Sequence, residues 1–503
     1  MELLISNLAH GFSVALSFEN LLFALLGCVI GTAIGVLPGI GPVATISLLL
    51  PITFGMSATT AIIMLAGIFY GAQYGGSTTA ILLNLPGEVS SVVTTLEGYK
   101  MARRGRAGAA LATAAIGSFF AGTVSTIIVA ASGPLLTKVA LSFGPADYFS
   151  LMLLGLIISA VLAQGSVVKA IGMVVLGVAL GLVGTDVQTG QQRFTFGIPE
   201  LSDGIGFVPV AMGMFGIAEI ILNLERPESR SVLTHKVGSL FLTKEEWKRA
   251  TPSVLRGTML GSLLGILPGG GASLAAFGSY MMERKISKYR HEFGTGAIEG
   301  VAGPEAANNA AAQTSFIPLL TLGIPANAVM ALMVGALIIQ GIQPGPRMVE
   351  AQPDLFWGLI ASMWVGNLML LVINLPMIGV WVKLLEVPYK YLYPSILIFC
   401  SIGVYSLNNN VFDIYMTLFF GIFGYLCSKL RLEAAPMLIG FVLGPMMEEH
   451  LRRAMLLSRG DPYVFIDYQN RPISTVLLAI SAIALLSMLL PGIRKGKDKA
   501  LAG

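Results

Sequence analysis

Apolar runs long enough to cross a lipid bilayer recur along nearly the whole chain, and no other feature constrains its fold as strongly. Examples are residues 109–131, 149–162, 167–183 and 476–490. A transmembrane helix needs roughly 20 apolar residues, whereas a membrane β-barrel shows shorter strands of alternating hydrophobicity. Only 12% of the residues are charged and the mean hydropathy is +0.78, while a soluble domain carries about 25% charged residues. The sequence therefore predicts an all-α polytopic membrane protein embedded in the lipid bilayer.

The positive charge is concentrated in a few short polar segments. These are residues 100–106, 225–256, 284–290 and the tail 494–499. Basic loops of membrane proteins lie on the cytoplasmic side, so the net charge of +4 indicates topology and not binding to nucleic acid. We expect these loops and the C-terminus in the cytoplasm. No cleavable signal sequence is expected, and residues 1–19 are predicted to form an interfacial segment.

The helix-breaking motif Leu-Pro-Gly stands inside two of the apolar runs. GVLPGIGPVA occupies residues 35–44 and GILPGGGASL occupies residues 265–274. The segment 257–282 lies between two basic loops and is too short for two crossings of roughly 20 residues each. It is therefore predicted to be a re-entrant hairpin with its tip in the membrane, where surrounding protein must satisfy the open backbone.

The loops that follow corresponding motifs in the two halves of the chain differ in their Lys and Arg content, and the difference reverses along the chain. The loop after the first copy, PITFGMSATT, has no Lys or Arg, whereas ERKISKYRHEF follows the second. Further on the bias reverses, with YKMARRGRAG in the first half and GIQPGPRMVEAQPD in the second. Similar motifs with opposite loop charge predict two inverted-topology repeats with re-entrant hairpins and broken helices, in about 10–12 transmembrane segments.

This pattern divides the chain into five predicted parts. They are the N-terminal interfacial segment 1–19, repeat 1 at 20–225, a cytoplasmic linker at 226–250, repeat 2 at 251–450, and an extra C-terminal transmembrane helix at 473–491.

Each half also carries a second polar interruption rich in small residues, at 69–88 and 303–327. Half-helix N-termini favour an anion, and freed carbonyls favour a small cation, so hairpin tips and broken helices together predict one substrate site. The predicted substrate-binding residues are Gly39, Gly41, Ser77, Thr78, Thr79, Asn84, Gly269, Gly271, Asn308, Asn309 and Thr314. The alternative is that these small residues serve only close helix packing.

Glu305 is the candidate for binding the coupling cation, together with Asn309. An acidic residue within a membrane segment is costly unless it is paired or functional. The alternative is a carboxylate that bonds nearby backbone or lies at the interface. Glu88 and Glu299 are weaker candidates, since each is close enough to a segment end to reach the headgroup region.

Other chemistries lack their motifs. LPGGGAS is not followed by Lys-Ser/Thr, which excludes a phosphate-binding P-loop. The three cysteines lie in apolar runs without metal-ligand spacing, and no embedded nucleophile–base pair indicates an enzyme. We therefore expect no catalytic residue, metal site or cofactor. A channel, or a permease for another small organic anion that needs no binding protein, is the alternative to a carrier.

Several stretches taken together resemble the large membrane subunit of tripartite tricarboxylate transporters, the TctA family. They are GVLPGIGP, YGAQYGGSTTAILLNLPGE, EGYKMARRGRAG, ILPGGGA, EFGTGAIEGVAGPEAANNAA, PLLTLGIPAN and GIQPGPR. The resemblance implies a bacterial inner-membrane carrier that imports a di- or tricarboxylate such as citrate, driven by Na⁺ or H⁺. It further implies two partners, a small TctB-like membrane subunit and a periplasmic TctC-like solute-binding protein. The resemblance assigns no site residues.

Overall fold

The structure, a computed structural model, describes residues 2–37, 41–163, 166–186, 188–225, 238–267, 271–384 and 389–489. Most of these residues are helical. Six helical segments among them are long and apolar enough to cross a membrane: Phe18–Val36, Val89–Leu141, Pro145–Leu162, Phe207–Glu225, Pro353–Asn374 and Val411–Lys429. The predicted class, an all-α polytopic membrane protein, is confirmed.

The described residues of the first half contain ten α-helices with short turns between them. They are α1 (Glu2–Ala15), α2 (Phe18–Val36), α3 (Pro42–Leu49), α4 (Ala58–Leu83), α5 (Val92–Met101), α6 (Ala107–Leu141), α7 (Pro145–Leu162), α8 (Val167–Gly181), α9 (Phe207–Ala211) and α10 (Ala218–Glu225). The shorter helical turns are η1 (Leu50–Gly55), η2 (Val89–Ser91), η3 (Ala102–Arg106), η4 (Pro199–Leu201) and η5 (Met212–Ile217).

The second half contains twelve described α-helices. They are α11 (Lys244–Gly265), α12 (Gly271–Ile286), α13 (Glu299–Thr314), α14 (Phe316–Leu322), α15 (Ala328–Ile339), α16 (Met348–Ala351), α17 (Pro353–Asn374), α18 (Ile378–Leu384), α19 (Tyr389–Asn408), α20 (Val411–Lys429), α21 (Ala434–Leu457) and α22 (Pro472–Leu489). Two short turns, η6 (Arg290–Glu292) and η7 (Pro462–Phe465), accompany them.

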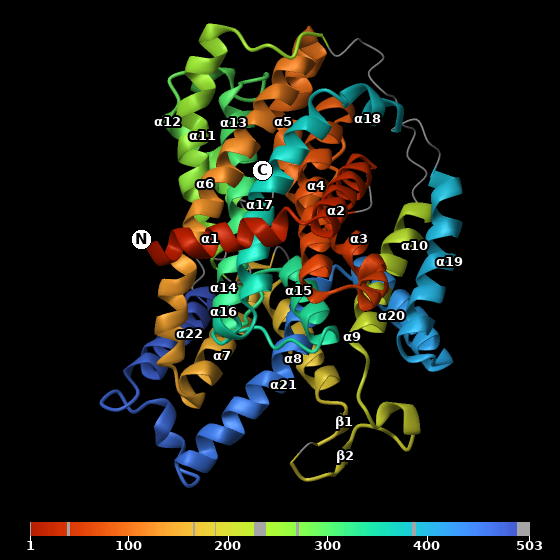
Figure 1. The fold of residues 1–503 in the computed structure, drawn as a ribbon, viewed down its shortest axis with the longest axis vertical. Helices are drawn as coiled ribbons and strands as arrows, with labels where there is room; N and C mark the ends of the chain where they lie inside the picture. Colours follow the sequence, from red (N-terminus) through yellow and green to blue (C-terminus); the bar gives the residue numbers. More distant parts are fainter. Residues whose placement is uncertain are drawn as a thin grey trace.

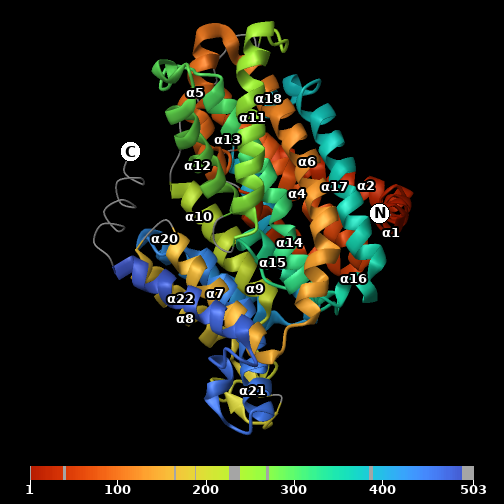
Figure 2. The same ribbon diagram turned by 90° about the vertical axis from the view of Figure 1, so that its left-hand side faces the viewer.

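The basic loops of the two halves gather at one end of the molecule, here called the basic end (Figure 1). Lys100 donates a 2.6 Å hydrogen bond to the carbonyl of Gly294, and Arg106 pairs with Glu246. The opposite end carries β1 (Gly184–Thr185), β2 (Gln192–Arg193) and the last turns of α21 (Figures 1 and 2). This clustering of the basic loops at one end is what loops on one side of the membrane would show.

A two-residue β-ladder is the only sheet among the described residues. β1 and β2 pair antiparallel, with Gly184 opposite Arg193 and Thr185 opposite Gln192. The sequence analysis did not predict it. The turn between the strands is held by Asp186, whose carboxylate accepts hydrogen bonds from the backbone N–H groups of Gln188 and Thr189. The ladder lies in the polar segment between α8 and α9.

Both Leu-Pro-Gly segments follow a helix that packs against a long inner helix through glycines. Cβ atoms at Gly27, Gly31 and Gly35 of α2 would lie 2.2–2.3 Å from carbonyl oxygens of α4. Cβ atoms at Gly257, Gly261 and Gly265 of α11 would lie 2.2–2.4 Å from carbonyl oxygens of α13. Only glycine permits such close backbone contact. The two helix pairs therefore repeat one packing scheme, and the inverted orientation of the halves stays a prediction.

The segment after the second Leu-Pro-Gly returns alongside the helix before it. Arg249 of α11 pairs with Glu292, just after α12, at 2.7 Å. Arg256 of α11 pairs with Glu283 of α12, also at 2.7 Å. These contacts place the start of α11 and the end of α12 together at the basic end. This is the arrangement of a helical hairpin.

The second interruption in each half is shorter than the sequence suggested. Residues 69–83 stay helical, and the hydroxyl groups of Ser77 and Thr78 bond carbonyls one turn back in α4, which satisfies them inside the helix. The break comes at Asn84, whose φ of 60° ends α4, and the corresponding break after α14 comes at Gly323, whose φ is 73°. Four residues beyond each, Glu88 and Asn327 begin the next helical segment. Both halves thus end an inner helix and restart the chain by the same local geometry.

Candidate functional site

The inner helices of the two halves face one another in antiparallel directions. Ser77 of α4 donates a 2.6 Å hydrogen bond to Glu305 of α13. Further along, the ring centroids of Tyr70 and Phe316 are 6.0 Å apart. Lower residue numbers on α4 therefore lie opposite higher residue numbers on α13 and α14. Polar side chains on these facing surfaces come from both halves of the chain.

Glu305 is buried, with 1% of its surface exposed. Its two carboxylate oxygens accept hydrogen bonds from hydroxyl groups, Oε2 from Ser77 and Oε1 from Thr94. No ion pair of the described residues involves Glu305. A buried carboxylate without a cationic partner is costly, so the site favours a bound proton or cation.

A second carboxylate, that of Glu88, lies beside the first. It accepts hydrogen bonds from Ser90 and, at 3.2 Å, from the amide of Asn308, one turn after Glu305 on α13. Glu88 is partly buried and, like Glu305, has no Lys, Arg or His within ion-pair distance among the described residues. Because Asn308 follows Glu305 by almost one helical turn, the two acids and their hydroxyl and amide partners, here called the network, lie close together across the halves.

Three buried carboxylates nearer the basic end are fully compensated, which sets Glu305 and Glu88 apart. Glu299 accepts two hydrogen bonds from Arg249, and Glu283 accepts two from Arg256. Glu97 accepts bonds from the Tyr280 hydroxyl and from the backbone N–H groups of residues 294, 296 and 297. Glu97 therefore ties α5 to the second half, Glu283 and Glu299 are paired within the second half, and Glu299 already has an arginine partner.

Asn309 fixes the orientation of α13 against α6. Its amide donates to the Ser118 hydroxyl at 2.7 Å and to the carbonyl of Glu305 at 3.2 Å. The Ser118 hydroxyl in turn reaches the same carbonyl at 3.5 Å. Asn309 therefore bonds the backbone of Glu305 and α6, and none of its hydrogen bonds reaches the Glu305 carboxylate.

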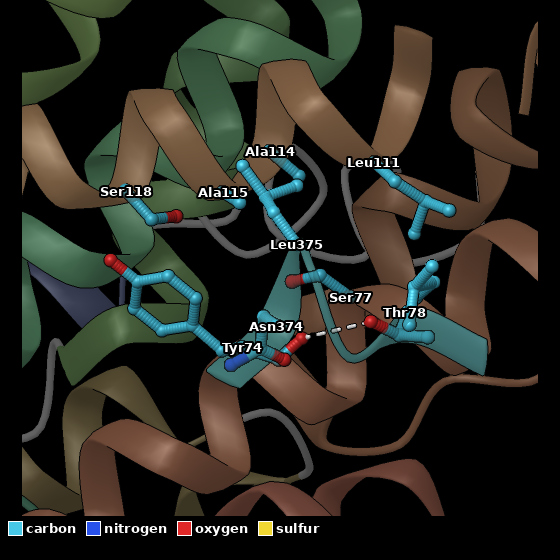
Figure 3. Close-up of a pocket in the computed structure, with 10 residues that line it drawn as sticks. Tyr74, Ser77, Thr78, Leu111, Ala114, Ala115, Ser118, Asn374 and Leu375 are labelled. Atoms are coloured by element: carbon cyan, nitrogen blue, oxygen red, sulfur yellow. Dashed lines mark hydrogen bonds between the residues drawn. The ribbon is translucent and has the colours of Figure 1, made fainter. Parts of the chain in front are cut away.

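A small cavity adjoins Ser77 between α4 and α6 (Figure 3). Its volume of about 10 Å³ is close to what one water molecule needs. Polar side chains of Ser77, Thr78, Ser118 and Asn374 line it together with apolar residues of α6. The buried Oδ1 of Asn374 has no hydrogen-bond partner among the described residues. The cavity suits a single water molecule next to the Glu305 network.

The predicted site residues lie in different parts of the structure. Ser77, Asn308, Asn309 and Glu305 belong to the network, and Thr78 lines the cavity. Gly41 and Gly271 begin α3 and α12 at the two Leu-Pro-Gly segments, and Gly271 has a φ of 52°. Gly39 and Gly269 lie outside the described residues.

The remaining three predicted residues have structural partners. Thr79 donates a 2.6 Å hydrogen bond to the carbonyl of Val36, which ties α4 to the end of α2. Thr314 donates to the carbonyl of Ala310 within its own helix. Asn84 is exposed and ends α4 in the left-handed conformation. None of these three side chains contacts Glu305 or Glu88 through a hydrogen bond among the described residues.

Sequence reasoning missed Thr94, Ser118, Gln73 and Asn374. Thr94 lies in the turn-rich stretch after the first break and Ser118 lies within an apolar run, so neither stands in a local motif. A search for isolated polar residues on the inner faces of apolar helices would have found Gln73 and Asn374. The partners of Thr94 and Ser118 across the halves are not visible in the sequence.

Comparison with known proteins gives a consistent result. The family model described as the tripartite tricarboxylate transporter TctA family matches residues 21–439. A protein of Agrobacterium vitis, named an uncharacterized 52.8 kDa protein in the TAR-I ttuC' 3'region, is 59% identical over 99% of this chain and 98% of its own length. A second protein of that organism, named an uncharacterized protein in the TAR-II ttuC' 3'region, is 61% identical over 48% of this chain and 98% of its own length. No solved structure matches the chain.

Proposed function

The chain belongs to the tripartite tricarboxylate transporter TctA family, and from this premise we propose that it imports a di- or tricarboxylate, such as citrate, by cation-coupled alternating access. It acts in the bacterial inner membrane, with the basic end and the C-terminus in the cytoplasm. A small TctB-like membrane subunit and a periplasmic TctC-like solute-binding protein complete the transporter, and the binding protein delivers the substrate.

One observation supports the coupling more than any other. Glu305 and Glu88 approach each other across the two halves, and the donors that reach them are hydroxyl and amide groups and not cationic side chains. Placing two uncompensated negative charges together in a low-dielectric interior is unfavourable. A proton or a Na⁺ ion relieves this cost, and the oxygen atoms around both acids suit either one.

The same arrangement links the ion to the substrate. A carboxylate substrate entering beside Glu305 and Glu88 is repelled while both acids are ionised and uncompensated. Binding of a cation first removes this repulsion, so each ligand raises the affinity for the other. Thr94, Ser77 and Asn308 hold the cation site, and the helix N-termini at the breaks favour the substrate anion.

The test is uptake into proteoliposomes that contain this chain and its small membrane partner. The binding protein and radiolabelled citrate are added outside, with and without an inward Na⁺ or H⁺ gradient. We expect accumulation above the external concentration only when one of the gradients is present. Accumulation of other di- or tricarboxylates but not citrate would correct the substrate and keep the mechanism. Uptake that does not saturate and never exceeds equilibrium under any gradient would contradict the proposal and favour a channel.

A further inference from the structure

The side chain of Gln73 is fully buried in the protein interior and makes no hydrogen bond. Its exposed fraction is 0%, and neither its amide nitrogen Nε2 nor its amide oxygen Oε1 has a partner among the described residues. Buried amides in folded proteins are almost always paired, because the lost hydration is otherwise uncompensated. A neighbouring residue on α4, Tyr74, donates its hydroxyl to Asn367. The free amide therefore indicates a ligand and not a loosely packed helix.

Gln73 lies at the level of the polar part of α13. On α4 it stands between Tyr70, whose ring contacts Phe316, and Ser77, which bonds Glu305. Because the helices run antiparallel, the residues of α13 opposite Gln73 are those just after Glu305. Asn308 is the first polar residue of that stretch and follows Glu305 by almost one helical turn.

Asn308 also faces the same side of α4 as Gln73. Gly76, close to one turn after Gln73, lies so near Glu88 that a Cβ atom there would stand 3.0 Å from its Cγ. Glu88 in turn accepts the hydrogen bond of the Asn308 amide. The Oδ1 atom of Asn308 has no partner. One unpaired donor and two unpaired acceptors, contributed by both halves, thus belong to Gln73, one turn before the Ser77 that bonds Glu305, and to Asn308, which bonds Glu88.

An amide presents its N–H₂ donor and its C=O acceptor side by side. This pair matches two neighbouring groups of a 2-hydroxycarboxylate, whose carboxylate accepts from Nε2 while its hydroxyl donates to Oε1. A plain dicarboxylate has no hydroxyl for Oε1 and leaves that acceptor unpaired. We propose that the Gln73 amide, opposite Asn308, contacts the substrate and selects carboxylates that carry a hydroxyl group on the carbon next to the carboxylate.

This inference rests on the proposed carboxylate transport and names the substrate class of the same site. It also gives Asn308 two functions. Its Nδ2 holds Glu88 of the cation site, and its Oδ1 faces the substrate with a second acceptor for a hydroxyl. A side chain that contacts both ligands couples their binding directly.

The experiment measures binding of radiolabelled malate and succinate, which differ by one hydroxyl, to this chain with its small membrane partner in lipid nanodiscs. The solute-binding protein is omitted because it would select among carboxylates by itself. We expect the wild type to prefer malate by roughly 10-fold or more, since a site built to bond a hydroxyl rejects the analogue that lacks it. The variant Gln73→Leu loses this preference, with malate affinity reduced roughly 10- to 100-fold and succinate affinity nearly unchanged.

Gln313→Leu is the matched control. Gln313 is also a buried glutamine with an unpartnered Oε1, but it stands one turn beyond Asn309, on the side of α13 that contacts α6. We expect it to keep the malate preference. Gln73→Glu keeps the side-chain size and an acceptor but removes the donor, and it is expected to lose malate binding as well. It replaces Gln73→Leu if that variant does not elute as a single folded species.

Two outcomes separate this inference from the proposed function. An unchanged malate-to-succinate ratio in both Gln73 variants, in a transporter whose wild type accumulates carboxylates, overturns the role of Gln73 alone. A wild type that accumulates no carboxylate under any cation gradient overturns the transport function and this inference together.

Discussion

At the scale of single residues, the protein treats its buried carboxylates in two ways. Glu283 and Glu299 each receive an arginine, and Glu97 receives four neutral donors from the facing half. Glu305 has hydroxyl donors only, and Glu88 has a hydroxyl and an amide. Removing one partner of a compensated buried pair is destabilising, whereas an uncompensated acid is free to exchange a proton or cation. The acids proposed to bind the cation therefore differ from Glu283, Glu299 and Glu97 in the kind or number of their partners and not in being buried.

Asp186, at the end of the molecule opposite the basic end, gives a prediction about how stability depends on pH. Hydrogen bonds from Arg452 and from the backbone N–H groups of Gln188 and Thr189 hold the pKa of the Asp186 carboxyl well below its usual 3.8. An acid with a lowered folded-state pKa stabilises the fold above its unfolded-state pKa, and this contribution is lost as the pH falls through the folded-state value.

We therefore expect Arg452→Gln to unfold at a lower temperature than the wild type by a margin that stays constant between about pH 8 and pH 5. The margin shrinks only in acid, below about pH 5, where Glu448 and Asp186, the two carboxylates that Arg452 bonds, begin to be protonated in the unfolded chain. Thermal unfolding in detergent across this pH range measures it. A margin that already shrinks near pH 6 would show that a histidine, and not Asp186, controls the effect.

Some of the residues around Glu305 and Glu88 could be predicted from the sequence. Ser77, Glu305, Asn308 and Asn309 were predicted because polar residues in apolar segments stand out locally. Thr94 and Ser118 were not, since their importance comes from pairing across 211 residues to Glu305 and 191 residues to Asn309. Thr79 and Thr314 have the same polar character but bond backbone carbonyls. Composition alone does not separate these two uses of a threonine.

At the scale of helices, glycine spacing determines how each hairpin packs on its inner helix. In α2 the glycines recur every four residues at 27, 31 and 35, and in α11 they recur at 257, 261 and 265. The spacing puts them on one face of each helix, where the backbone of α4 or α13 lies in contact. The sequence predicted the breaks through Leu-Pro-Gly, but it did not predict that the polar stretch 69–83 continues as a helix.

Gly31→Ala tests this packing. A Cβ atom at Gly31 would stand 2.3 Å from the Ile68 carbonyl oxygen, so α2 and α4 must move apart. We expect destabilisation of about 1–3 kcal/mol, the usual cost of overpacking. The control is Gly172→Ala in α8, where a Cβ atom meets nothing within 4 Å. It should leave stability equal or slightly higher because alanine favours the helix. Equal unfolding temperatures for the two variants in detergent would refute the packing account.

At the scale of the whole molecule, the two halves meet along their inner helices and are joined by ion pairs and loop contacts at the basic end. We propose that the hairpins and broken helices move as a unit against the remaining helices during transport. The inverted repeat predicted from the sequence supports this, because two halves that exchange conformations give outward- and inward-open states. Contacts between the moving unit and the other helices must then change during the cycle.

A single substitution tests this motion, because the native Cys28 of α2 lies against α17. A Cβ atom at Gly366 would stand 3.6 Å from the Cys28 sulfur, so Gly366→Cys places two thiols in contact. We expect oxidation to abolish gradient-driven uptake and reduction to restore it. The control pair Ser150→Cys with Ser474→Cys joins α7 to α22, whose hydroxyls are 2.8 Å apart, and should not inhibit. Full uptake by the cross-linked Gly366→Cys protein would contradict the proposed motion.

In the proposed mechanism, Glu305 binds the cation that drives carboxylate accumulation. The most direct measurement compares wild type with Glu305→Gln in the same proteoliposomes, recording both uptake driven by a Na⁺ or H⁺ gradient and exchange of internal for external carboxylate without a gradient. The neutral amide mimics a permanently protonated acid, so we predict that exchange persists while gradient-driven accumulation is lost. Accumulation equal to that of the wild type would contradict the assignment of Glu305.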